Sequence, residues 1–168
     1  MKRLLLKSFM LAMLGIAYTA GAQAEEGMFS TKSLTLKVAT KAAQAALDNC
    51  RASGFQVAVA VIDRGGNLQV LLRDRYAGPH TVQTAMGKAW TAVSFRSNTS
   101  SMVDLIKKGE VPPGIQDIPG TLFVGGGMPV QAAGSIVAGI GVSGAPGGSK
   151  DDVCAKAGID AIEADIAF

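Results

Sequence analysis

Residues 56–74 read QVAVAVIDRGGNLQVLLRD, and the architecture of the chain can be built outward from them. The first part is apolar almost without alternation from Val57 to Ile62, which is typical of a strand buried on both faces. The turn sequence Arg64-Gly65-Gly66-Asn67 separates it from a second apolar run that begins at Leu68. This pattern predicts a β-hairpin with strands over 56–63 and 68–74.

Helical spacing of apolar residues appears on both sides of this hairpin. It predicts a helix from Ser33 to about Ala52, a second from Thr81 to about Phe95 and a shorter one from Ser101 to Lys108. A closing helix is expected to start at Ser149, a plausible N-cap, and to continue to the end of the chain. Three further strands are expected over Thr121–Val124, Pro129–Ala133 and Ser135–Ser143. The order predicts an α+β fold in which a single five-stranded, largely antiparallel sheet is flanked by helices.

The N-terminal segment has the organisation of a secretory signal peptide. Lys2, Arg3 and Lys7 precede an apolar run of roughly a dozen residues from Phe9 to about Ala20, and Ala22-Gln23-Ala24 follows as a cleavage sequence. The run is shorter than the ~20 residues that span a bilayer, so no stable membrane anchor is expected. We therefore predict a signal peptide over 1–24, one domain over 25–168, and a periplasmic or secreted protein.

Removal of this segment changes the charge of the protein. It takes away three of the 16 Lys and Arg residues and leaves 13, equal to the 13 Asp and Glu residues. A formally neutral chain lacks the basic surplus that nucleic-acid-binding proteins show, so no nucleic-acid partner is expected.

The two cysteines, Cys50 and Cys154, fall late in the first predicted helix and early in the last. In an oxidising compartment they can form a disulfide. Two buried free thiols that pack as small hydrophobic groups are the alternative. The sequence leaves both open.

Several common chemistries lack the residues they need. Gly147-Gly148-Ser149-Lys150 does not have the order of a phosphate-binding loop. Gly141-Val142-Ser143-Gly144-Ala145 departs from a nucleophile elbow at its last position, and no histidine follows it. One histidine and two distant cysteines provide no ligand pair for structural zinc.

Four segments resemble the GlcG/HbpS family. In order, they are VIDRGGNL (61–68), GGGMPV (125–130), GIGVSGA (139–145) and DDVCAKAGI (151–159), and GKAWTA (87–92) is similar to a further run of that family. The resemblance covers nearly all of the chain from about Leu34. It implies one antiparallel sheet with flanking helices, homo-oligomeric assembly, and haem binding or haem-linked redox sensing in some members.

Haem iron takes His, Tyr, Met or Cys as protein ligands. His80, the sole histidine, lies in a loop directly before a predicted helix and is the leading candidate for the iron. Tyr76 is the second, and Met86 and Met102 are further candidates that would line the haem site. The alternatives are an ordinary exposed histidine and methionines that pack in the core.

These observations lead to the hypothesis of an exported, oligomeric haem-binding protein that acts in haem or iron handling or in redox sensing. The alternative is a periplasmic accessory or small-metabolite-binding protein without haem. Haem degradation is a third option, so the enzymatic status stays open.

Overall fold

The computed structural model describes residues 27–167, so the predicted signal peptide, 1–24, lies outside the described residues. Residues 31–168 form one compact unit; of the other unit, 1–30, only 27–30 are described, and they contain no helix or strand. The elements are α1 (Leu36–Ala52), β1 (Ala58–Asp63), β2 (Leu68–Arg73), α2 (Thr81–Phe95), α3 (Thr99–Lys107), the 3-10 helix η1 (Pro113–Asp117), β3 (Gly127–Ala132), β4 (Ser135–Ser143), α4 (Gly148–Asp160) and α5 (Glu163–Ile166). None of the described helices combines the length and the apolar composition that crossing a membrane requires.

The strands form one antiparallel sheet in the order β2-β1-β4-β3. The two most apolar strands, β1 and β4, are central, and Val61 lies opposite Ile140 in their register. The predicted hairpin is present as β1 and β2, with a bulge between Val61 and Ile62. The α+β class and the antiparallel sheet are confirmed.

The prediction of five strands is wrong, because the sheet has four. The expected strand at Thr121–Val124 is instead an irregular segment packed on α2. The Leu122 amide donates to Thr91 Oγ1 at 2.7 Å, and the Val124 amide donates to the carbonyl of Leu122. Its amides are therefore used by a helix side chain and by local turns, and Gly126, at φ 114°, then turns the chain into β3.

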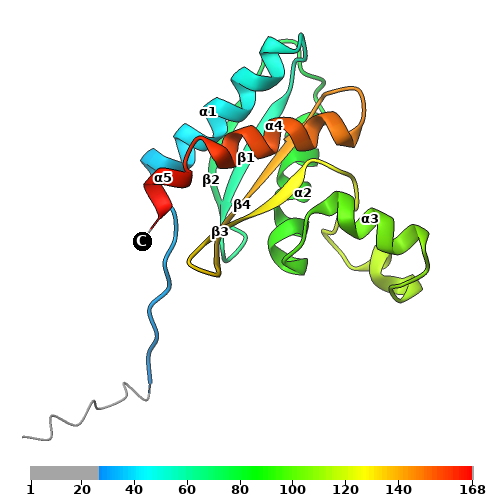
Figure 1. Cartoon of the computed structure of the whole chain (residues 1–168). Helices are drawn as coiled ribbons and strands as arrows, with labels where there is room; N and C mark the ends of the chain where they lie inside the picture. The colour runs from blue at the N-terminus through cyan, green and yellow to red at the C-terminus, as the bar shows by residue number, and fades with distance from the viewer. Residues whose placement is uncertain (1–26, 168) are drawn as a thin grey trace, which may run out of the picture. The chain divides into compact units, whose positions relative to one another are not determined.

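Helices cover both faces of the sheet. On one face α1 and α4 lie side by side (Figure 1). A cluster of Val59, Val61, Ile140 and Val142 packs against alanines of α1 there. On the other face α2 packs on β1 and β4. The intervening residues of these strands are small, so the fold has three layers in which α2 can lie very near the sheet.

The close approach of α2 depends on glycine in β4. A Cβ atom at Gly141 would lie 2.0 Å from the carbonyl oxygen of Ala85, and one at Gly139 would lie 2.9 Å from that of Ala89. Because no side chain fits there, the backbone of α2 rests directly on β4. This contact holds the middle of α2 against β4, and both halves of the helix line cavities described below.

The closing helix differs from the prediction at both of its ends. The residue before α4 is Gly147, at φ 102°, so Ser149 lies inside the first turn and is not the N-cap. A left-handed φ of this size is open to glycine and strained for serine. The helix also stops at Asp160, where the buried Ile162 separates it from α5.

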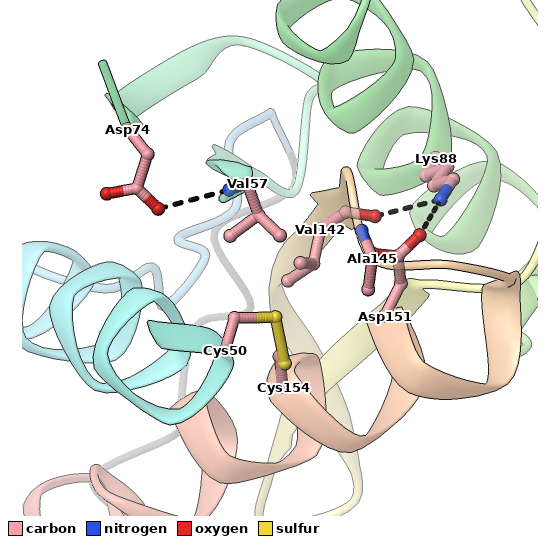
Figure 2. The surroundings of a disulfide bond; sticks show 8 residues. All are labelled: Cys50, Val57, Asp74, Lys88, Val142, Ala145, Asp151 and Cys154. Atoms are coloured by element: carbon pink, nitrogen blue, oxygen red, sulfur yellow. Dashed lines mark hydrogen bonds and ion pairs between the residues drawn. A yellow bond between two sulfur atoms is a disulfide. The ribbon is translucent and has the colours of Figure 1, made fainter. Parts of the chain in front are cut away.

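A disulfide joins Cys50 of α1 to Cys154 of α4 (Figure 2). The two Cα atoms are 5.5 Å apart, within the range that a disulfide bridges. Both residues are buried, so the bond lies inside the layer that α1 and α4 form. It connects positions 104 residues apart in the sequence.

Candidate functional site

His80 immediately precedes α2 and is exposed. Its carbonyl oxygen accepts from the amide and the hydroxyl of Thr84, which anchors the backbone to the first turn of the helix. The ring lies over Gly78, where a Cβ atom would come within 2.7 Å of Cε1 and 2.9 Å of Nδ1. Among the described residues neither ring nitrogen has a hydrogen-bond partner, so the imidazole is held by packing and keeps both nitrogens available.

The imidazole borders a cavity of about 320 Å³, here called the His80 cavity. Hydroxyl groups and glycine backbone dominate its walls. The lining residues are Gly78, His80, Thr81, Thr84, Lys88, Val124, Ser143, Gly144, Ala145, Gly147, Gly148 and Asp151. They come from the start of α2, the end of β4 and the start of α4, so the cavity lies where the three elements meet.

A buried ion pair forms part of this cavity. Lys88 Nζ lies 2.7 Å from Asp151 Oδ2, and the two side chains are 2% and 4% exposed. Lys88 also donates to the carbonyl of Val142 at 2.9 Å, and the amide of Ala145 donates to Asp151 Oδ1 at 3.0 Å (Figure 2). The pair therefore links α2 and α4, which lie on opposite faces of the sheet, past the end of β4.

Two opposing influences act on the Asp151 carboxyl. Burial disfavours its charged form and is the larger, while the hydrogen bond and the charge of Lys88 favour it. The net result is that the pKa of Asp151 is raised above its ordinary value.

The other predicted ligands do not line the His80 cavity. Tyr76 lies in the same loop as His80 and is 79% exposed. Met86 is half-buried against the small core of Ala58, Ala60 and Ala85 on the α2 face of the sheet. Met102 is buried in α3. Both methionines are packed side chains, as in the alternative that the sequence left open.

The Lys88–Asp151 pair is not predictable from the sequence pattern at Asp151, because an acidic residue there is equally well explained as charge at the start of a helix. A signal was present at Lys88. It shares one helical stripe with Ala85 and Ala92, both fully buried, so its spacing places a charged residue on the apolar face. A lysine at such a position needs a buried partner.

Residues 34–160 match the family model described as "Haem degrading protein HbpS-like". The chain belongs to the HbpS-like family. The match spans the four strands and the four helices α1 to α4, and it confirms the resemblance found in the sequence.

Solved structures that are similar to this chain share its fold. A double mutant of HbpS from Streptomyces reticuli is 46% identical, with a TM-score of 0.76 over 83% of this chain and 92% of that one. A PduOC–haem complex is 26% identical, with a TM-score of 0.72 over 77% of this chain and 95% of that one. An uncharacterised 15.0 kDa protein of Citrobacter freundii, from the dhaT–dhaS intergenic region, is 31% identical over 113 residues, which are 66% of this chain and 80% of that protein.

Proposed function

We propose that this HbpS-like protein binds haem and that His80 supplies a ligand to the iron. The observation that carries the proposal is the imidazole itself, which is exposed, borders a cavity and has no hydrogen-bond partner among residues 27–167. Family membership and the haem complex of the PduOC relative support the same function. Imidazole is a common protein ligand of haem iron, so the His80 side chain is a suitable donor for haem.

The His80 cavity presents the imidazole that would bind the iron, but it does not accommodate the whole haem macrocycle. At about 320 Å³ and with walls of hydroxyl groups and backbone, it is too small and too polar to enclose a flat apolar ring. The ring would therefore lie outside the cavity, over the exposed surface around His80, where Tyr76 is available as the second candidate ligand. A second copy of the chain that covers this surface would shield the ring, which favours the predicted homo-oligomer.

Export is part of the proposal. The leader-like sequence over 1–24 supports it, and a disulfide between Cys50 and Cys154 suits an oxidising compartment. In the periplasm or outside the cell, a haem protein of this kind would act in haem or iron handling or in redox sensing. The mass of the exported protein tests the leader, because cleavage after Ala24 leaves a chain that starts at Glu25.

A haemin titration of the mature protein tests the ligand. We expect a saturable Soret shift, and His80→Ala is expected to weaken binding at least tenfold and to change the spectrum of the complex. Gly78→Ala should weaken binding by a smaller factor, because the new Cβ atom would displace the imidazole. Absorbance measures both effects.

Tyr76→Phe is the matched control, since it removes the neighbouring candidate donor and keeps the ring. A saturable shift that survives His80→Ala and is lost in Tyr76→Phe would transfer the ligand role to Tyr76. Weak, non-saturating binding in the wild-type protein would overturn the proposal. Haem degradation has its own signature, which is loss of the Soret band with reductant and oxygen together with release of iron.

A small-metabolite-binding role without haem is the second candidate. A second, larger cavity at the other end of α2 favours it, and its walls have a different chemistry.

A further inference from the structure

The second cavity, here called the arginine cavity, has a volume of about 500 Å³. Three segments form it: the β1–β2 turn, the end of α2 and the β3–β4 hairpin. The lining residues are Arg64, Gly65, Gly66, Trp90, Val93, Ser94, Arg96, Gln131, Gly134, Ser135 and Ile136. Its lining on α2 begins at Trp90, ten residues after His80, so roughly 15 Å of helix separate this cavity from His80.

The charge of the arginine cavity is positive. Neither Arg64 nor Arg96 has an ion-pair or hydrogen-bond partner for its guanidinium within residues 27–167, and no lining residue is acidic. The nearest carboxylate in the sequence, Asp63, accepts instead from the amides of Gly65 and Asn67 and from the Asn67 side chain. Two guanidiniums are therefore left to face an anion from solution.

The backbone conformation at Arg96 indicates that this residue has a function besides ending α2. Arg96 ends α2 in the left-handed conformation, at φ 54° and ψ 34°, a position that glycine usually occupies. Among the described residues the other non-glycine with positive φ is Ala133, in the β3–β4 turn beside Gly134. Both strained positions therefore adjoin the arginine cavity, and strain of this kind concentrates at functional sites.

One wall of the arginine cavity is apolar. The indole of Trp90 packs under the β1–β2 turn, where a Cβ atom at Gly66 would lie 2.9 Å from its Cδ1 and Nε1. Val93 and Ile136 extend this wall. A ligand that uses both features has an anionic group for the arginines and an apolar part for the indole.

We infer that the arginine cavity binds a small organic acid, whose carboxylate is held by Arg64 and Arg96 and whose apolar part lies on Trp90. Guanidinium groups match carboxylates in charge and in fork geometry. The inference does not depend on haem binding, because no residue lines both cavities. It provides a site for the small-metabolite role.

The intrinsic fluorescence of the haem-free mature protein tests this inference, because Trp90 is the sole tryptophan. Benzoate, phenylacetate and succinate are the acids, benzamide is the uncharged analogue of benzoate, and inorganic phosphate is the anion without an organic part. We expect a saturable change with at least one aromatic acid and at least tenfold weaker binding of benzamide. Phosphate at the same concentration should not displace the bound acid.

Two variants locate the binding. Arg64→Gln and Arg96→Gly should each weaken it at least tenfold, whereas Lys37→Gln, which removes an exposed charge on α1, should leave it unchanged. Arg96→Gly also separates binding from folding, since glycine suits the left-handed position and the unfolding temperature should stay the same or rise. The inference fails if no acid gives a saturable change, if benzamide or phosphate binds as well as the acid, or if both arginine variants bind like wild type.

Discussion

Lys88→Met is expected to lower the free energy of unfolding by about 3–5 kcal/mol. Methionine keeps most of the volume of lysine, so packing of α2 on the sheet is largely preserved. The loss comes from Asp151, whose carboxylate is 4% exposed and would keep only the amide of Ala145 as a partner. Denaturant unfolding at pH 7, followed by circular dichroism, measures the change.

The double variant Lys88→Met/Asp151→Asn is the control. Replacement of a whole buried pair is often neutral, because the cost of desolvating two charges disappears with their attraction. We therefore expect the double variant to be more stable than Lys88→Met alone, by about 2 kcal/mol or more. A Lys88→Met protein within about 1 kcal/mol of wild type would contradict the buried pair.

The raised pKa of Asp151 adds a pH dependence with a definite sign. Above pH 3.8 the unfolded chain releases the proton of this carboxyl first, while the folded chain still holds it. The contribution of the Asp151 carboxyl to the free energy of unfolding is therefore fully present below pH 3.8 and is lost as the pH rises through the folded-state pKa. Relative to Asp151→Asn, the wild-type free energy of unfolding should fall over that interval, and a rise would contradict the direction of the shift.

Reduction of the disulfide is expected to cost about 4–5 kcal/mol, the second large effect. In the chain-entropy model the cost grows with the loop that the bond closes, and a loop of about a hundred residues corresponds to roughly 4.7 kcal/mol. The separation here is 104 residues. Guanidinium unfolding with and without a phosphine reductant measures the difference, and mobility on non-reducing gels shows whether the bond is intact.

Cys50→Ala/Cys154→Ala is the matched variant. It should unfold near the midpoint of the reduced wild-type protein, and reductant should not change it. The two side chains are almost completely buried, so each alanine leaves a small void, and we expect the variant to be less stable than the reduced wild-type protein by no more than about 1 kcal/mol. If reductant opens the bond fully and the wild-type midpoint does not move, the predicted contribution is wrong.

Local patterns predicted most of the fold. The unbroken apolar runs of β1 and β4 and the helical spacing in α1 and α2 depend on neighbouring residues, so they can be recognised in the sequence. Thr121–Val124 has a similar local composition, yet Thr91, 31 residues from Leu122, captures one of its amides. The prediction of a fifth strand was wrong because the hydrogen-bond partner of a backbone amide can lie far away in the sequence.

The residues of the candidate site also divide into those that could be predicted from the sequence and those that could not. His80 could be proposed from the sequence because its residue type and its place before a helix are enough to make it a candidate ligand. Lys88 and Asp151 are 63 positions apart, and the arginine cavity combines residues from Arg64 to Ile136. No spacing rule connects such residues, since only the packing of α2 on β4 determines which of them share a cavity.

From the sequence alone we could predict the α+β class, the β1–β2 hairpin and the HbpS-like family, and name His80 as a candidate iron ligand. Each of these depends on residue type and on short-range periodicity, which survive in the unfolded chain. The tertiary structure decided the number of strands, the burial of Lys88 against Asp151 and the placing of two cavities at opposite ends of α2. All three depend on contacts between residues far apart in the sequence, such as that of the β4 glycines with the α2 backbone, and these contacts exist only once the layers have packed.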